Sequence, residues 1–151
     1  MKKLQLAFTT TNGPLSWAIR TFTWSNFSHV DLYFPEENLL IGAVPFKGVI
    51  SRNADEVFKQ ASKISVYEVD VDSELARSII MGQIGKPYDW TAVMGFLLRR
   101  NWQETDSWDC SEIASYVILK AGLKLFNEDL NRITPRDLVI HNDLKLIEVK
   151  K

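Results

Sequence analysis

Cys110-Ser111-Glu112-Ile113-Ala114-Ser115-Tyr116-Val117-Ile118-Leu119-Lys120 is the stretch in which helical spacing is clearest. An apolar stripe runs along one side of the predicted helix, and Gly122 ends the pattern. A helix of this kind is stable when its stripe is buried against another layer of the domain, so we expect a sheet to pack on it. The stripe consists of Ile113, Val117 and Ala121, with Ala114 and Ile118 beside it.

Most of the predicted strands come before this helix in the chain. Alternating apolar residues and bounding turn residues predict strands at 4–10, 28–34, 39–44, 48–52, 64–71 and 144–149. Cap residues and helical spacing predict further helices at 15–23, 90–99 and 134–137, and one that begins after 72–73 and stops before Gly85. Because the strands come mainly before the helices, the order indicates an α+β domain rather than an alternating parallel sheet.

Length and charge limit the kinds of protein that this chain can be. Its 151 residues are enough for one ordinary domain, and we interpret 1–151 as a single domain. The net charge of −1 argues against sequence-independent binding to nucleic acid or anionic lipid. The basic start at 1–8 is not followed by the apolar stretch of a secretion signal. The chain contains no run of about 18 apolar residues, which a membrane-spanning helix would need. We therefore expect a cytoplasmic location and no integral membrane segment.

Cys110 is the single cysteine, which excludes an internal disulfide. It lies at the start of the predicted helix, where unpaired N–H groups and the positive end of the helix dipole stabilise a thiolate. The same N–H groups would stabilise an oxyanion at a carbonyl that the sulfur attacks. A lone cysteine is more often a small buried apolar residue than a nucleophile, but its place at the helix start makes the nucleophile an equal alternative.

A cysteine nucleophile needs a base, and the chain offers His29 and His141. His29 begins a predicted strand, and Asp31 shares its face because side chains two residues apart point the same way. An acid in that place fixes the tautomer of the imidazole and stabilises its charged form. His141 lies in a predicted turn. A strand holds a ring more rigidly, so we favour His29 as the base.

Simpler interpretations compete with these. A His–Asp pair on a strand is often a surface ion pair, and the tryptophans at 24, 90 and 108 are as readily core residues as residues that line a groove. Two histidines, one cysteine and scattered acids show no spacing typical of metal ligands. We therefore expect neither a metal nor a cofactor.

Several short motifs together resemble the NlpC-type papain-like thiol hydrolases, from about Pro14 to Leu138. In that family a Gly-x-Pro-Tyr segment precedes an Asp-Cys-Ser nucleophile at a helix start. Here the histidine strand precedes the cysteine, which is similar to the circularly permuted branch that includes the lecithin–retinol acyltransferase-like proteins. The matching stretches are Ser28-His29-Val30, Gly42-Ala43-Val44-Pro45-Phe46-Lys47-Gly48-Val49, Gly85-Lys86-Pro87-Tyr88-Asp89-Trp90, Trp108-Asp109-Cys110-Ser111 and Ile133-Thr134-Pro135-Arg136-Asp137-Leu138.

The resemblance implies a permuted papain-like fold, with an antiparallel sheet packed against helices. It implies that Cys110 is the nucleophile and His29 the general base, and that the hydroxyl of Tyr88 assists at the oxyanion or holds substrate. Many permuted members carry a glutamate on the strand after the histidine, where this chain has Gly42. We interpret Asp31 as the substitute for that acid, because its side chain shares a face with His29.

These residues favour a cysteine hydrolase that cleaves an amide bond through a thioester on Cys110. The resemblance implies a peptide or small-molecule substrate, such as a peptidoglycan peptide, and a bacterial or phage-associated protein. One alternative is a lipid acyl hydrolase or acyltransferase with the same dyad, which would carry an exposed apolar patch near Cys110. Another is a binding module or virion component that keeps the fold without catalysis, for which Gly42 is the main support.

Overall fold

A computed structural model describes residues 1–23, 25–90, 108–127 and 129–151. Its framework is a six-stranded antiparallel sheet in the order β4-β3-β2-β1-β5-β6. The strands are β1 (Lys3–Thr10), β2 (His29–Phe34), β3 (Leu39–Val44), β4 (Gly48–Asn53), β5 (Lys63–Asp72) and β6 (Leu144–Val149). The α-helices are α1 (Pro14–Thr23), α2 (Ala54–Gln60), α3 (Ser73–Met81), α5 (Cys110–Lys120) and α6 (Pro135–Val139), and η1 (Pro35–Glu37) and η2 (Leu130–Arg132) are short 3₁₀ turns.

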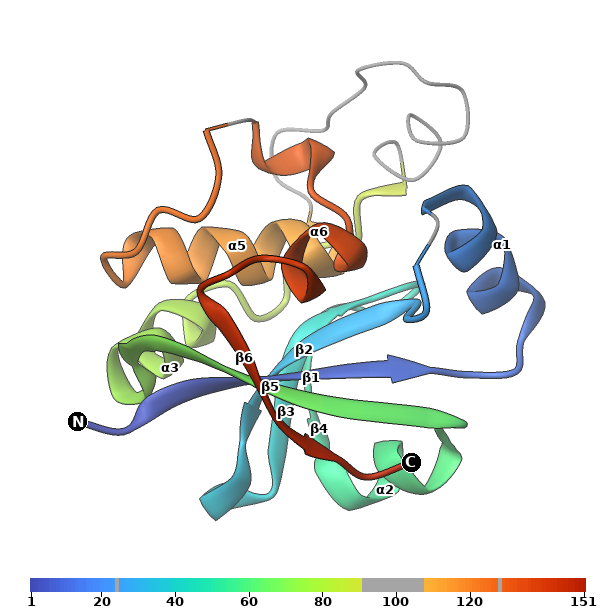
Figure 1. Cartoon of the computed structure of the whole chain (residues 1–151), viewed down its shortest axis with the longest axis horizontal. Coiled ribbons are helices and arrows are strands. Elements are labelled where there is room, and N and C mark those ends of the chain that lie inside the picture. Colours follow the sequence, from blue (N-terminus) through green and yellow to red (C-terminus); the bar gives the residue numbers. More distant parts are fainter. Residues whose placement is uncertain (24, 91–107, 128) are drawn as a thin grey trace.

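The helices cover the sheet unequally (Figure 1). α3, α5 and α6 lie on one side of the sheet, α2 lies on the other, and α1 lies near the end where β2 begins. α5 contacts β2 and β3, and its N-terminal end points toward this same end of the sheet. The first residue of the cysteine helix and the first residue of the histidine strand are therefore brought to one end of the molecule.

Side-chain alternation along β2 gives the sheet two apolar faces. Val30, Leu32 and Phe34 join the larger core, which also contains the buried stripe of α5. Tyr33 lies on the opposite face and packs with Phe58 of α2 in a smaller core. His29 and Asp31 are four and two residues away from Tyr33 along the strand, so their side chains share its face. β2 therefore places its apolar residues under α5 and its polar pair on the other face.

The turn between β3 and β4 holds the segment that leads to Tyr88. Gly48 has a φ of 76°, and a Cβ there would lie 2.3 Å from the carbonyl oxygen of Lys86. Only glycine tolerates both the left-handed backbone and this close approach. The approach allows Val49 N–H to donate to the Lys86 carbonyl at 2.9 Å, and Gly85 N–H to donate to the Val49 carbonyl at 2.9 Å. The segment before Tyr88 is thereby tied to β4.

The predicted α+β class is confirmed, and all six predicted strands are present with small changes in their ends. The helix at 110–120 and the strand at 39–44 have the predicted bounds. α2 was not predicted, because its apolar pattern covers only two turns; Asn53 caps it by accepting from Glu56 N–H at 3.2 Å. The predicted helix at 90–99 lies almost entirely outside the described residues. The sheet does not confirm the more specific prediction of a permuted papain-like arrangement.

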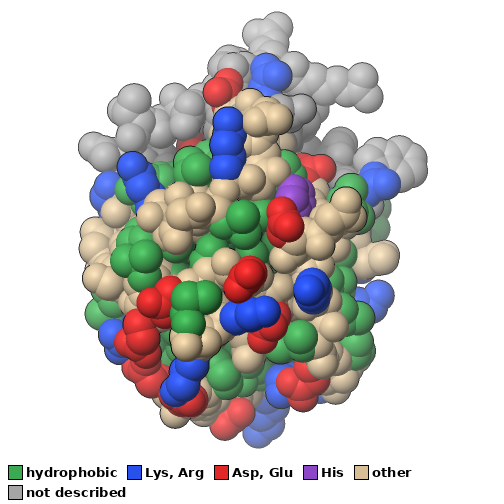
Figure 2. Space-filling view, turned by 60° about the vertical axis from the view of Figure 1, so that its left-hand side comes forward, with side chains coloured by type: hydrophobic (Ala, Val, Ile, Leu, Met, Phe, Trp, Pro, Cys, Tyr) green, Lys and Arg blue, Asp and Glu red, His purple; other side chains and the backbone are tan. Residues whose placement is uncertain are grey.

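The surface is mixed in charge. Figure 2 shows one face on which Lys and Arg side chains are interspersed with Asp and Glu. This agrees with the near balance of charges in the sequence. Within the described residues, no helix is both long enough and apolar enough to cross a membrane.

Burial of the α5 stripe against the sheet predicts a steep difference between neighbouring residues of this helix. Ile118 is fully buried, whereas Leu119 is 40% exposed. Ile118→Ala should lower the free energy of unfolding by about 2–5 kcal/mol, because it leaves a cavity between α5 and the sheet. Leu119→Ala should lower it by less than about 1 kcal/mol. Urea denaturation of both variants checks this, and similar losses in the two would contradict the packing described.

Candidate active site

α5 begins with a capping box that fixes the position of Cys110. The Asp109 carboxylate accepts from Glu112 N–H at 2.9 Å, and Glu112 in turn accepts from Asp109 N–H at 3.5 Å. The Ser111 hydroxyl reaches the Ile133 carbonyl at 2.7 Å and so ties the first turn to the segment before α6. Cys110 is therefore the first residue of a well-anchored helix, and it is 5% exposed.

Cys110 and His29 interact directly. Burial lowers the pKa of His29, but the charge of Asp31, the charge of Cys110 and hydrogen bonds to both outweigh burial and raise the pKa to about 10. His29 Nε2 lies 3.0 Å from Asp31 Oδ1, which leaves Nδ1 as the ring nitrogen for the sulfur. The structure therefore brings together the cysteine, the histidine and the acid that the sequence suggested.

Asp31 occupies the space over Gly42. A Cβ at Gly42 would lie 2.3 Å from Asp31 Oδ1, the oxygen that meets the His29 ring. Asp31 is fully buried, and although burial raises its pKa, the neighbouring His29 and Arg52 lower that pKa below its usual value. The glycine in the place of the expected acid is thus what allows the acid to come from β2 instead.

Arg52, on β4, is a site residue that sequence reasoning missed. Its Nη2 donates to Asp31 Oδ2 at 2.7 Å and lies 3.2 Å from His29 Nε2. Asp31 thereby accepts from His29 with one oxygen and from Arg52 with the other. Two cations share one carboxylate, and the carboxylate between them offsets their repulsion. Arg52 belongs to a predicted strand, but its place opposite Leu40 depends on a register that no local pattern reveals.

Tyr88 is held near the site by two backbone hydrogen bonds that join its segment to the residue before the α5 cap. Asp89 N–H donates to the Trp108 carbonyl at 3.0 Å, and Trp108 N–H donates to the Pro87 carbonyl at 3.0 Å. Burial raises the pKa of Tyr88 well above its usual value, and the charges of Cys110, Asp109 and Asp89 raise it further. Its hydroxyl is therefore protonated at neutral pH and able to donate a hydrogen bond.

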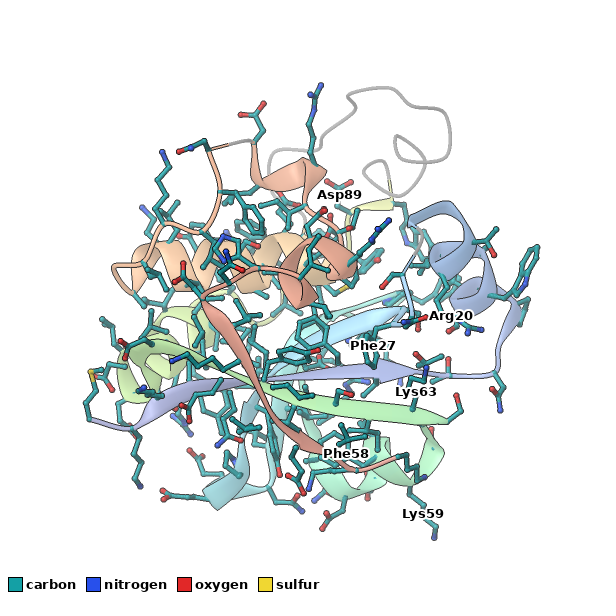
Figure 3. The ribbon with its side chains drawn as sticks, viewed as in Figure 1. Arg20, Phe27, Phe58, Lys59, Lys63 and Asp89 are labelled. Carbon is teal, nitrogen blue, oxygen red and sulfur yellow. The ribbon has the colours of Figure 1, made fainter. Side chains whose placement is uncertain are left out.

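Two buried carboxyl groups lie on this side of the site. Asp89 and Asp109 are 0% and 4% exposed, and Figure 3 shows Asp89 near the N-terminal end of α5. Burial raises the pKa of Asp109 to about 6. A raised carboxyl pKa means that the folded state loses stability as the pH rises from about 4 to about 6. Sequence reasoning did not assign either group a role in the site.

The alternative base, His141, is occupied elsewhere. Its Nε2 lies 2.7 Å from the Leu125 carbonyl, and its ring stands edge-on to Phe126 at 4.9 Å. Of the tryptophans considered for a groove, Trp90 packs at a tilt against the ring of Tyr88, and Trp108 packs at a tilt against the ring of Tyr116. Trp24 lies outside the described residues.

Comparison with known proteins gives one informative likeness. No family model matches the chain, and no curated protein matches it. A solved structure from Escherichia coli O157:H7, described as the metalloprotein yiiX of DUF1105, is similar with a TM-score of 0.74. The match covers 97% of this chain and 96% of that one, at 15% identity. At this identity the likeness shows a shared fold and nothing about activity.

This finding overturns the expected membership in the NlpC-type thiol hydrolases. The similar structure is described as a DUF1105 metalloprotein, and no family model supports the resemblance. The physical reason is that the quoted motifs are short and partly generic. Asp109 and Glu112 form a capping box, and so do Thr134 and Asp137 at the start of α6. Many unrelated helices begin in this way.

The similar structure is that of a metalloprotein, but the described residues of this chain do not fit a metal centre. Among them, His, Cys, Asp and Glu do not gather into a group of three that could hold a metal ion. Both oxygens of Asp31 are engaged, one by His29 and the other by the guanidinium of Arg52. Because both of its oxygens are engaged and its charge is already compensated, this carboxylate is a poor ligand for a metal ion.

Gly42→Ala tests the place of Asp31. The added methyl group displaces the oxygen that meets His29, so we expect the free energy of unfolding at about pH 6 to fall by about 1–3 kcal/mol. The raised pKa of His29 stabilises the fold fully below its unfolded value of about 6.5, and this stability is lost as the pH rises through about 10. The deficit of the variant should therefore shrink at about pH 10.5.

Urea denaturation at both pH values measures the deficit. Gly82→Ala is the matched control, because the nearest atom to its added methyl group is the Ile79 carbonyl oxygen at 3.4 Å, an ordinary contact. A Gly42→Ala deficit of the same size at both pH values would mean that the His29–Asp31 pair contributes nothing.

Proposed function

We propose that this chain is a cysteine hydrolase that cleaves an amide bond through a thioester on Cys110. One observation supports the proposal most: the Cys110 side chain interacts by charge and by hydrogen bond with a histidine whose far nitrogen meets a buried carboxylate. Nucleophile, base and orienting acid in this sequence of contacts are the elements of a catalytic triad. The proposed amide hydrolysis does not need a permuted papain-like order of these elements. That order remains a prediction.

In the first step the Cys110 sulfur attacks the amide carbon, and the carbonyl oxygen becomes an oxyanion. The backbone N–H of Cys110 has no acceptor within the helix and would stabilise that oxygen. The next N–H groups of the turn, those of Ser111 and Glu112, already donate to the Asp109 carboxylate. The Tyr88 hydroxyl would donate from the other side. His29 then gives its proton to the amide nitrogen, the C–N bond breaks and an amine leaves.

In the second step water attacks the thioester. Neutral His29 takes a proton from the water, the C–S bond breaks, and the carboxylic acid and the free thiol are released. Asp31 holds the ring in both steps, because its Oδ1 accepts from Nε2 at 3.0 Å. Arg52 in turn holds Asp31 by its second oxygen. Arg52 is a positioning residue in this step, because it acts through Asp31.

A second candidate function, hydrolysis of lipid acyl groups, is favoured by one surface feature. Phe46 is 86% exposed in the β3–β4 turn. Its ring contacts the tilted ring of Trp90, with centroids 4.7 Å apart, and Trp90 contacts the tilted ring of Tyr88 at 5.1 Å. This row of aromatic rings leads from the surface to the site and would suit an acyl chain. The amide proposal needs no such patch.

Thiol labelling tests the dyad. At mildly acidic pH, Cys110 in the folded protein should react readily with iodoacetamide, because the protonated His29 ring stabilises negative charge on the sulfur as it reacts. His29→Ala should slow the reaction at least about tenfold. His141→Ala should leave the rate unchanged, since His141 contacts Leu125 and Phe126 away from the sulfur. An unreactive Cys110, or equal labelling rates in the two histidine variants, would contradict the proposal.

Substrate preference separates the two candidate functions. The amide proposal expects turnover of soluble peptide amides and little change in Phe46→Ser. The lipid alternative expects a long-chain ester to be hydrolysed faster in micelles than as a monomer, with a loss of several-fold in Phe46→Ser. Ile140→Ser, another exposed apolar residue at 64%, is the control. Micelle activation that depends on Phe46 would replace the amide proposal by the lipid one.

A further inference from the structure

A pocket of about 270 Å³ opens beside His29, between α1 and α2. Its lining includes the ring of His29 and the side chain of Arg52. The volume is near the lower limit for small-molecule sites. The pocket is therefore sized for a group of about one residue rather than for a polymer.

The ring of His29 relates this pocket to the proposed reaction. His29 gives its proton to the leaving nitrogen, so the leaving group lies against that ring when the C–N bond breaks. The pocket that the ring lines is in position to receive the leaving half of the substrate.

The charge of the pocket wall determines which charge the leaving half of the substrate can carry. Its described lining contains His29 and Arg52 and no Asp or Glu. The nearby carboxylate, Asp31, is fully buried, so the fixed charge that the described wall presents to the pocket is the guanidinium of Arg52. A positive wall rejects an amine and favours an anion.

Arg52 is the group suited to bind that anion. The hydroxyls of Ser16 and Ser28 bond to each other at 2.7 Å, so part of the polar wall is already engaged. Arg52 has five N–H donors, and its hydrogen bonds within the described part of the chain use Nη2 alone. Its side chain is 23% exposed. A guanidinium presents its donors in a planar fork that matches a carboxylate.

We propose that this pocket binds the leaving amine of the substrate by a carboxylate, with Arg52 as the specificity-determining residue. The substrate is then an acylated amino acid or short peptide with a free carboxyl group. The reaction adds water across the C–N bond and yields a carboxylic acid and an amine that bears this carboxylate. The inference rests on the proposed function, since it assigns the leaving side of the same site.

Acyl transfer tests the pocket without knowledge of the natural acyl group. p-Nitrophenyl acetate would form acetyl-Cys110, and an added amine would compete with water for the thioester. A pocket that holds a leaving amine also holds an attacking one, because the two steps are the reverse of each other. The acceptors are glycylglycine and glycylglycinamide, at equal concentrations of unprotonated amine. They differ in the terminal carboxylate.

We expect glycylglycine to give about tenfold more acetylated product than glycylglycinamide, measured by mass spectrometry. Arg52→Gln should bring this ratio to about one, whatever its effect on the overall rate. The control, Arg20→Gln, changes an arginine of α1 that lies outside the pocket lining and bonds to the Ser16 carbonyl at 3.4 Å (Figure 3). It should keep the wild-type ratio.

The outcomes separate the two proposals. Acetyl-Cys110 that passes equally to both acceptors would overturn the pocket proposal alone. A high ratio that survives Arg52→Gln would overturn the role of Arg52. Failure of Cys110 to form any acetyl thioester would overturn the proposed function, and the pocket proposal with it.

Discussion

The buried carboxylate of Asp31 is the group on which the site depends. It is fully buried on β2 and stays charged because His29 and Arg52 each donate to one of its oxygens. An isolated charge in such a place would be costly, and removal of either partner would leave it poorly compensated. The absence of a side chain at Gly42 makes the room that this arrangement needs. Residues from β2, β3 and β4 are therefore coupled through one carboxylate.

The rest of the fold brings Cys110, the proposed nucleophile, to this cluster. The apolar residues of β2 lie under α5, and its polar residues lie on the opposite face. At the beginning of β2 the two meet, because the capped first turn of α5 brings Cys110 to His29. The surroundings then differ on the two sides. Buried acids, Asp89 and Asp109, lie near Cys110, whereas the pocket beyond His29 is lined by Arg52. In the proposed reaction, this asymmetry would orient the substrate.

Local chemistry made much of this predictable from sequence. Helical spacing and the terminating Gly122 predicted the bounds of α5, and alternation placed Asp31 on the face of His29. The contact of Arg52 with Asp31, and the room that Gly42 leaves for Asp31, could not be predicted. Both depend on strand register, and a shift of one residue would turn each to the other face. The family resemblance failed for a related reason. Short capping motifs are dictated by helix ends, so their presence says little about ancestry.

The protonation state of His29 tests the account most directly. In the chain there are two histidines, so ¹⁵N chemical shifts of the ring nitrogens can be assigned with a His141→Gln variant. At about pH 8 both nitrogens of His29 should carry protons, because Asp31 and Cys110 raise its pKa to about 10. A neutral His29 ring at that pH, in the folded protein with Asp31 intact, would contradict the account.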